Sequence, residues 1–305
     1  MAGEDGAVPA LDADALIAAV PQIGEVAART VSERPGVQVT LPEALAIARA
    51  AVGEASAGRG VVVTHGTDTL EETAFLCDLL YAGDAPVVFT GAIRPASAPG
   101  ADGPANLRDA VALARSDAAA GLGALVAFAG EVHAARAVRK SSSTAPSAFS
   151  SPGVGPLGHV REGRATIVHR IERRPPIPVA ELDASVHVVA AGLGTDGALV
   201  EAAVAAGADG LVAVALGAGH VPPPFLAAVR RAAAAVPVIA TVRPERGAIL
   251  HETYAFEGAE RDLRASGAIC AAALSPAAAR IKLLACLGAG YDRAAIGAAF
   301  APDDR

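Results

Sequence analysis

The chain has 305 residues, of which 52% are apolar, and its formal net charge is −7 at pH 7. This length allows one large domain or two ordinary ones, and the apolar content is enough for a sizeable core. The negative charge, with no block of basic residues, argues against nucleic acids and anionic membranes as partners. The opening residues have no leader pattern, and no apolar run has the length of a membrane span. We therefore expect a cytoplasmic protein.

Cysteine and lysine are both scarce. Cys77, Cys270 and Cys286 are far apart and form no CxxC pair, which indicates small buried side chains rather than a disulfide or a metal site. Of the 25 basic residues only Lys140 and Lys282 are lysines. A desolvated amine can lose its proton whereas a guanidinium cannot, so a lysine in an arginine-rich chain is a candidate for chemistry. We single out Lys140 and take Lys282 as an ordinary lysine.

Short β-branched runs alternate with alanine-rich helical stretches in the first half of the chain. This alternation predicts βαβ units, and we expect an α/β fold with a larger N-terminal, doubly wound (flavodoxin-like) parallel sheet covered by helices on both faces. A short hairpin is expected over 159–170, around Arg161-Glu-Gly-Arg164. The predicted helices cover 13–19, 70–80 and 106–118, and the predicted strands cover 60–65, 85–91 and 123–130.

A polar, proline-rich break follows at Arg173–Pro178 and is the best linker candidate. We predict an N-terminal domain over 1–172, a linker over 173–184 and a smaller C-terminal α/β domain over 185–305. In this second domain the predicted strands cover 185–191, 210–216 and 236–242, and the predicted helices cover 198–206, 224–235 and 275–287.

The sharpest local pattern is Thr64–Thr73, where a buried strand ends and a helix begins. Ligands of open α/β folds bind at this carboxyl edge of the sheet. Gly66 permits a tight turn, and Thr67 and Asp68 place oxygens at the start of a helix whose free N–H groups favour an anion. A plain N-cap would use the same residue types for stability alone. The local pattern leaves both interpretations open.

The run His65-Gly-Thr-Asp-Thr-Leu-Glu-Glu-Thr-Ala74 resembles a signature of the bacterial-type L-asparaginase/glutaminase family. Further segments resemble the same family in the same order, and together they span most of the chain. They are Thr90–Pro95, Ala101–Asn106, Ala135–Lys140, Ala148–Pro152, Gly155–Gly158 and Ser275–Arg280.

The resemblance implies a cofactor-free and metal-free hydrolase of side-chain amides, with L-asparagine or L-glutamine as substrate and a threonine acyl-enzyme as intermediate. It places Thr67, Lys140 and Asp68 as a Thr–Lys–Asp triad. A hydroxyl needs an adjacent base to become a good nucleophile, which Lys140 could supply. Asp68 would then orient the lysine or bind the substrate's α-amino group. The family also implies a homodimer or homotetramer.

The resemblance suggests further substrate-binding positions beside the triad. Gly66 lies in the signature, and Gln38 stands nearest to the family's substrate-gripping serine. His220, in Gly217-Ala-Gly-His-Val221, falls in the segment that reaches a neighbouring subunit's site, although an ordinary loop histidine is an equal alternative. Glu252 and Glu257 are both candidates for the acid that the neighbouring subunit supplies.

Family members open with a strand that runs into Thr-Gly-Gly-Thr, which carries their first nucleophile. No such run occurs here, and the first threonine is Thr30. Gly3–Ala10 resembles the far side of the mobile loop that follows this motif. We therefore expect an N-terminally truncated member, with weak or no amidase activity in this form.

Two alternatives remain. Gly192-Leu-Gly-Thr-Asp-Gly197 fits GxGxxG and suggests an NAD-binding oxidoreductase, but no carboxylate stands at Ala215–Gly219, where that fingerprint requires one. The other is a non-catalytic asparagine- or aspartate-binding paralogue that keeps Thr67, Asp68 and Lys140 as ligand contacts.

Overall fold

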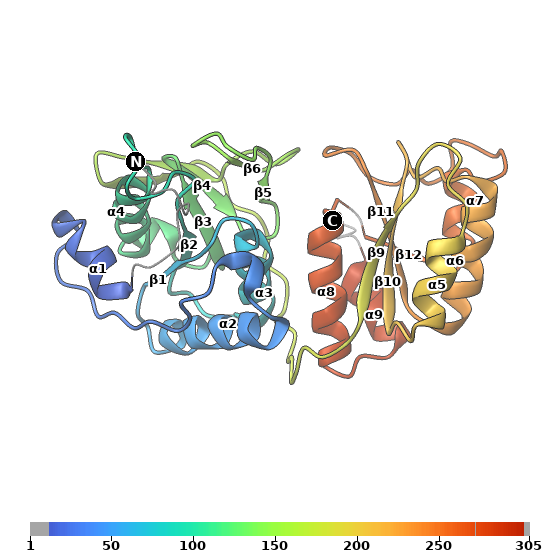
Figure 1. Cartoon of the computed structure of the whole chain (residues 1–305), viewed down its shortest axis with the longest axis horizontal. Helices are drawn as coiled ribbons and strands as arrows, with labels where there is room; N and C mark the ends of the chain where they lie inside the picture. Colours follow the sequence, from blue (N-terminus) through green and yellow to red (C-terminus); the bar gives the residue numbers. More distant parts are fainter. Residues whose placement is uncertain (1–11, 272, 302–305) are drawn as a thin grey trace. The chain divides into compact units, whose positions relative to one another are not determined.

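The structure is a computed structural model that describes residues 12–271 and 273–301 (Figure 1). The predicted loop remnant Gly3–Ala10 lies outside the described residues. The chain divides into two compact units, which meet in sequence between Pro176 and Ile177.

The first unit is built on a mixed six-stranded sheet in the order β1-β2-β3-β4-β7-β8. The first three strands in this order are parallel, and the pairs from β3 to β8 are antiparallel. A separate two-stranded ribbon, β5–β6, carries the lysine segment. The strands are β1 Val61–Thr64, β2 Val87–Thr90, β3 Ala124–Phe128, β4 Glu131–Ala134, β5 Arg139–Lys140, β6 Phe149–Ser150, β7 Gly158–Arg161 and β8 Arg164–Ile167.

Helices cover both faces of this sheet (Figure 1), with α4 on one face and the packed pair α2 and α3 on the other. Residues Val88, Leu125 and Ala110 belong to the core beneath α4. A capping box at Thr40 and Glu43 begins α2, which explains its sharp start. The helices are α1 Ala13–Ala18, η1 Pro21–Ile23, η2 Gly36–Gln38, α2 Leu41–Ser56, α3 Leu70–Leu80, α4 Gly103–Ala114 and η3 Asp117–Ala119.

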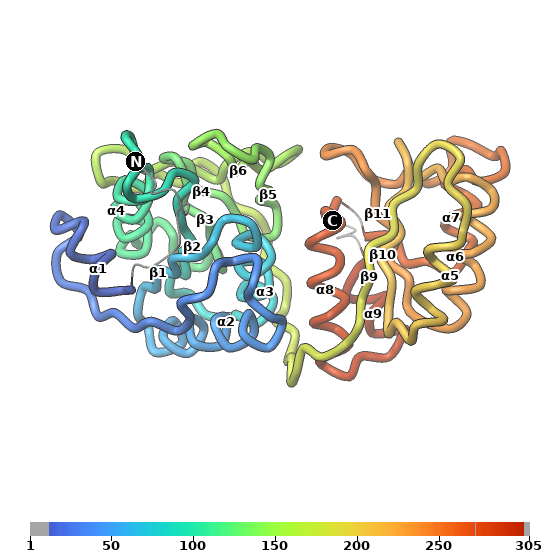
Figure 2. Tube along the Cα trace, in the orientation of Figure 1, coloured from blue at the N-terminus to red at the C-terminus, as the bar shows by residue number. Residues whose placement is uncertain are grey.

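Residues 24–35 connect η1 to η2 without a helix or a strand (Figure 2). The end of α4 holds this connection, because Arg115 donates to the carbonyl oxygens of Ile23 at 2.6 Å and Glu25 at 2.8 Å. This contact fixes the chain leading to η2, which reaches the candidate site.

The second unit contains a wholly parallel four-stranded sheet in the order β12-β11-β10-β9. Helices α5 and α6 pack on one face and α8 and α9 on the other (Figure 1). The core beneath α6 is centred on Phe225, Leu211 and Val238, all nearly inaccessible. The elements are β9 Val186–Ala190, α5 Ala198–Ala205, β10 Gly210–Ala215, α6 Pro223–Ala235, β11 Val238–Val242, α7 Glu260–Arg264, β12 Ile269–Cys270, α8 Pro276–Gly288 and α9 Arg293–Phe300.

The predicted α/β architecture is confirmed, with a larger first unit and a smaller second one. The first sheet differs from the expectation in one respect: it is mixed. Short turns join β3 to β4 and β7 to β8 and make these pairs antiparallel, and β7 returns antiparallel to β4 after the segment that carries the β5–β6 ribbon. Helix α4 begins at Gly103, earlier than predicted, because Pro104 fits the first turn of a helix.

Candidate active site

The turn from β1 to α3 carries Gly66, Thr67 and Asp68 at the carboxyl edge of the sheet. His65 braces the turn from inside: its Nδ1 lies 2.8 Å from the carbonyl oxygen of Gly66 and its Nε2 lies 3.2 Å from Thr73 Oγ1. Burial lowers the pKa of His65, and the contact with the Gly66 carbonyl opposes this shift. The ring is therefore a neutral brace at pH 7, with Nδ1 as the donor.

Close backbone approaches hold the same turn from outside. A β-carbon on Gly66 would lie 2.6 Å from Gly36 N, and one on Gly91 would lie 2.4 Å from the carbonyl oxygen of His65. The hydroxyl of Thr69 donates to the carbonyl oxygen of Gly36 at 2.8 Å. The η2 turn and the loop after β2 thus clamp the residues on either side of Thr67.

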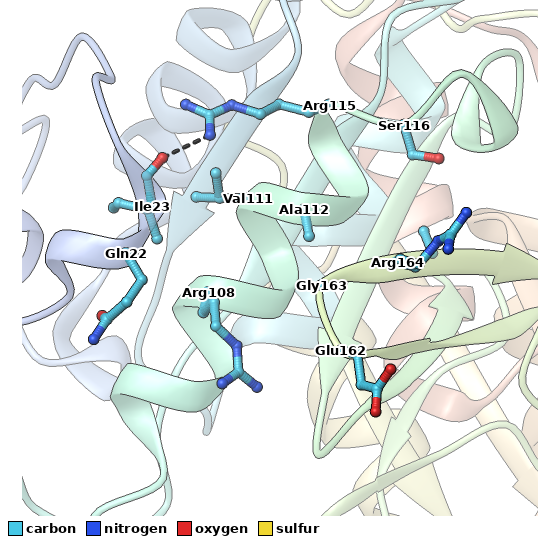
Figure 3. A pocket seen from close by; sticks show the side chains of 11 residues that line it. Gln22, Ile23, Arg108, Val111, Ala112, Arg115, Ser116, Glu162, Gly163 and Arg164 are labelled. Atoms are coloured by element: carbon cyan, nitrogen blue, oxygen red, sulfur yellow. Dashed lines mark hydrogen bonds between the residues drawn. The ribbon is translucent and has the colours of Figure 1, made fainter.

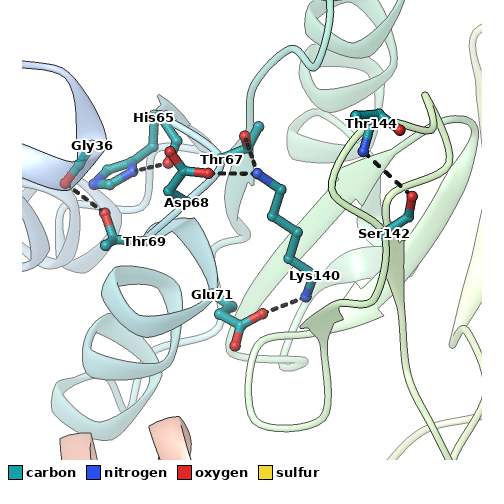
Figure 4. Close-up of polar contacts among 10 residues, drawn as sticks. Gly36, His65, Thr67, Asp68, Thr69, Glu71, Lys140, Ser142 and Thr144 are labelled. Atoms are coloured by element: carbon teal, nitrogen blue, oxygen red, sulfur yellow. Dashed lines mark hydrogen bonds and ion pairs between the residues drawn. The ribbon is translucent and has the colours of Figure 1, made fainter.

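Lys140 comes from the β5–β6 ribbon and points its amine at this turn (Figure 4). Its Nζ lies 3.0 Å from Thr67 Oγ1 and 2.6 Å from Asp68 Oδ1. The lysine side chain is 18% exposed, whereas that of Asp68 is 58% exposed. The structure therefore brings together the three residues of the predicted triad, with the carboxylate open to solvent.

Glu71, in the first turn of α3, contacts the main chain of the same lysine. The backbone N–H of Lys140 donates to Glu71 Oε2 (Figure 4). Burial raises the pKa of Glu71, while this hydrogen bond and the charges of Arg139 and Lys140 oppose the shift. Glu71 is not among the residues predicted from the sequence, although an acidic residue in the first turn of a helix is a recognisable pattern, because a negative charge is favoured there.

The loop after β2 is held by two polar residues of the Ala101–Asn106 segment. Asp102 accepts hydrogen bonds from the backbone N–H groups of Ile93 and Arg94, the shorter at 2.8 Å. Asn106, which is 3% exposed, donates to the carbonyl oxygen of Gly91 at 2.9 Å and accepts from Ala129 N at 3.0 Å. These contacts fix the loop that packs against Thr67.

The predicted substrate-binding residue Gln38 is not joined to this cluster. Gln38 is exposed at the end of η2, and the residue of η2 that touches the turn is Gly36. The reason is geometric: the 3₁₀ turn presents its first residue, not its last, to Gly66. His220 belongs to the second unit.

Within that unit His220 lies over a buried acid. Its Nε2 is 3.3 Å from Glu260 Oε2, and its ring stands edge-on to Tyr254 and Phe256 with centroids 5.0 and 5.1 Å away. Burial raises the pKa of Glu260, but hydrogen bonds from backbone N–H groups, with Tyr254 the first, outweigh it and lower the pKa overall. The acid beside His220 is thus Glu260, which the sequence did not single out.

The glycine-rich turn Gly192–Gly197 has its own local explanation. The hydroxyl of Thr195 accepts from Gly192 N at 2.8 Å, and Asp196 accepts from Ala198 N at 3.1 Å. A β-carbon on Gly197 would lie 2.3 Å from Ala228 Cβ on α6. The donors that would cradle a pyrophosphate therefore serve the turn itself, and the glycine serves helix packing.

A hollow of about 810 Å³ lies elsewhere on the first unit, between η1, α4 and the β7–β8 hairpin (Figure 3). Its walls include Arg108, Arg115, Arg164 and Glu162, and none of the triad residues. Arg115 turns to the carbonyl oxygen of Ile23 and not into the hollow (Figure 3).

Neither a membrane span nor a metal cluster is found in the described parts of the chain. No helix within 12–271 and 273–301 is both long and apolar enough to cross a bilayer. The same residues contain no group of three or more His, Cys, Asp or Glu side chains arranged to hold a metal ion.

Fold and site together define a two-unit α/β protein with a threonine hydroxyl, a lysine amine and a carboxylate at the carboxyl edge of its first sheet. Comparison with known families adds what the whole sequence resembles. Residues 1–173 match the asparaginase N-terminal model and residues 185–300 match the glutaminase/asparaginase C-terminal domain model. The chain belongs to the asparaginase/glutaminase family.

Individual relatives agree. A probable L-asparaginase of Deinococcus radiodurans is 40% identical over 237 residues, which cover 76% of this chain and 72% of the relative. A probable periplasmic L-asparaginase of Haemophilus influenzae is 34% identical over 287 residues, covering 90% of this chain and 79% of the relative. The crystal structure of a probable cytoplasmic L-asparaginase from Campylobacter jejuni superposes with a TM-score of 0.87 at 29% identity, covering 95% and 94% of the two chains.

Proposed function

We propose that this chain hydrolyses the side-chain amide of L-asparagine to L-aspartate and ammonia, with Thr67 as nucleophile, Lys140 as its base and Asp68 as orienting carboxylate. The observation that carries the proposal is the 3.0 Å contact between Lys140 Nζ and Thr67 Oγ1. Family membership and the names of the relatives support the reaction class.

In the proposed reaction the proton that leaves the Thr67 hydroxyl is the proton that ammonia carries away. Thr67 Oγ1 attacks the amide carbon while its proton passes to Lys140 Nζ, a step in which the lysine acts as the neutral amine with a free lone pair. Collapse of the tetrahedral intermediate breaks the C–N bond, and the same proton leaves on ammonia. Water then adds to the Thr67 ester, giving a carboxylic acid and restoring the hydroxyl.

Asp68 has two tasks in this scheme. Its Oδ1 accepts from Lys140 Nζ at 2.6 Å and keeps the amine turned toward Thr67. Because the carboxylate is 58% exposed, its other oxygen is available to the α-ammonium group of a substrate. Such a pairing would select a free amino acid, either L-asparagine or L-glutamine, because both carry the same α-ammonium group.

The test is ammonia release from L-asparagine, measured for the wild type, Lys140→Met and Thr67→Val. We expect any turnover by the wild type to fall by about 10³-fold or more in each variant, since a nucleophile and its base act as a unit. Thr144→Val, an exposed threonine close to the lysine ribbon, is the matched control and should keep wild-type turnover. Turnover that survives in Lys140→Met would refute the assignment.

A second candidate function is amino-acid binding without turnover. It is favoured by the ion pair between Asp68 and the Lys140 amine, because these two charged groups would serve ligand binding as well as they would serve turnover. Calorimetry with L-aspartate separates the two: binding without ammonia release selects the binding protein, and ammonia release selects the hydrolase.

The proposed assembly is a homodimer or homotetramer, and the proposed compartment is the cytoplasm, a word that the name of the Campylobacter jejuni structure also carries. Sedimentation at micromolar concentration tests the assembly, for which a monomer would be the contrary result.

A further inference from the structure

We propose that Glu71 is a positioning residue for Lys140. It fixes the main chain of the lysine against helix α3 so that the amine meets Thr67. The catalytic part of this inference rests on the proposed function, whereas the structural part does not.

The register of the lysine ribbon leaves the Lys140 N–H without a partner in its own ladder. Lys140 stands opposite Phe149, and the next residue, Ser141, donates to the carbonyl oxygen of Ala148 at 2.7 Å. This pattern makes Lys140–Phe149 a non-hydrogen-bonded pair, whose N–H groups point away from the partner strand. The Lys140 N–H points toward α3, where the Glu71 carboxylate accepts it.

The contact with Glu71 ties together two segments that are 69 positions apart in sequence. One short stretch of chain, from Thr67 to Glu71, therefore holds Lys140 at both ends. Thr67 and Asp68 contact the amine, and Glu71 contacts the backbone N–H (Figure 4). A flexible four-carbon side chain meets a defined target only if the main chain that carries it is fixed. The ribbon has just two residues in each strand, which offers few hydrogen bonds to fix that main chain.

A carboxylate suits this task better than a neutral acceptor, because hydrogen bonds to an ionised acceptor are shorter and stronger. Glu71 also sits in the first turn of α3, where a negative charge is favoured. Burial raises the pKa of Glu71, and the hydrogen bond from the Lys140 N–H and the charges of Arg139 and Lys140 oppose this rise.

Three variants separate reach from charge. Glu71→Gln keeps an acceptor oxygen and the length of the side chain. Glu71→Asp keeps the negative charge but has a side chain one methylene shorter. Glu71→Met removes the acceptor. We expect kcat for asparagine to fall roughly 10- to 100-fold in Glu71→Met and Glu71→Asp, with KM little changed, because a displaced catalytic group loses rate rather than binding. Glu71→Gln should stay within about threefold of the wild type. Glu54→Met, a half-exposed glutamate on α2, is the matched control and should leave kcat unchanged.

A second readout needs no activity, because the chain has only two lysines. Lysine labelled with ¹⁵N at the backbone and ¹³C at Cε gives two signals of each kind, and Lys282, inside α8, is the internal reference. In Glu71→Met and Glu71→Asp the Lys140 amide proton should move upfield and exchange faster, and its Cε signal should shift. In Glu71→Gln both signals should stay close to the wild-type positions.

Each outcome decides the inference. If the Lys140 signals do not move in Glu71→Met and Glu71→Asp, or if they move and kcat is unchanged, the positioning role is refuted. If the wild type releases no ammonia, the proposed function fails on its own and the Cε signal decides the structural part. In that case the positioning role is supported if the Lys140 Cε signal shifts in Glu71→Met and not in Glu71→Gln. It is refuted if the Cε signal does not shift in Glu71→Met. If Glu71→Met does not fold, Glu71→Asp takes its place.

Discussion

Gly36 and Gly66 approach each other so closely that neither has room for a β-carbon. A β-carbon on Gly36 would lie 2.9 Å from Gly66 O, and one on Gly66 would lie 2.6 Å from Gly36 N. Both neighbours are backbone atoms, which cannot rotate away as a side chain could. The contact sets the distance between the η2 turn and the residue that precedes Thr67.

We predict that Gly66→Ala lowers the free energy of unfolding by about 1–3 kcal/mol, the usual cost of forcing extra volume into a packed site. Because the displaced backbone leads into Thr67, activity should fall as well. Gly53→Ala is the matched control: a β-carbon there meets nothing within 4 Å, and Gly53 lies inside α2. It should raise stability by about 0.5–1 kcal/mol. Urea unfolding measures both, and equal effects would contradict the packing argument.

We predict that Asn106→Leu costs about 2–4 kcal/mol of unfolding free energy. The change strands the carbonyl oxygen of Gly91 and the N–H of Ala129 at a site that is 3% exposed, and each buried group without a partner costs roughly 1–3 kcal/mol. Asn106→Asp keeps the acceptor for Ala129, but it loses the donor to the carbonyl oxygen of Gly91 and sets a second carboxylate beside Asp102 Oδ2, to which Asn106 Nδ2 donates at 3.2 Å, so it should be destabilised as well. If both variants unfold at the wild-type urea concentration, Asn106 does not hold the loop.

The pH dependence of stability should include a contribution from His133 on β4. This side chain is inaccessible, its Nδ1 lies 3.0 Å from Ser151 Oγ, and burial lowers its pKa to about 4 from 6.5. A lowered pKa means that the folded state binds fewer protons, so the stability from neutral His133 is complete above pH 6.5 and is lost as the pH falls toward 4. The loss amounts to about 3 kcal/mol at 1.36 kcal/mol for each pH unit.

The check for His133 compares urea unfolding of the wild type and of His133→Leu/Ser151→Ala at pH 7, 6 and 5. The double variant removes His133 and Ser151 together, so no buried hydroxyl is stranded, and Glu131, whose Oε2 lies 3.3 Å from His133 Nε2, is half-exposed and stays solvated. Its stability should fall less between pH 7 and pH 5 than that of the wild type. Parallel curves for the two proteins would show that His133 does not titrate in this way.

Much of the fold could be predicted from local patterns. The β-branched runs gave the positions of β1, β2 and β3, and the helix over 70–80 matches α3 as observed. The mixed character of the first sheet was missed, because a strand as short as β4 carries little alternation to read and because the hairpin expected over 159–170 was not assigned to this sheet. The same holds for β12, which has two residues.

The convergence of Thr67 and Lys140 could be expected from the family resemblance, but not from the residues alone, since 73 positions separate them. Gln38 was chosen because it stands nearest to the family's substrate-gripping serine, and the contact through Gly36 was missed because backbone atoms make it. Glu71 was passed over for the same reason: its partner is a backbone N–H, whose direction depends on the register of a two-residue ribbon. Contacts of this kind depend on geometry that no sequence spacing reveals.

The most direct test of the central claim, that Thr67 is the attacking hydroxyl, is peptide mass mapping of enzyme quenched in acid during turnover of L-asparagine. We predict an aspartyl ester on the peptide that contains Thr67, and its absence in Thr67→Val and Lys140→Met. Turnover with the ester on another residue, or with Thr67 unmodified at every quench time, would contradict the account.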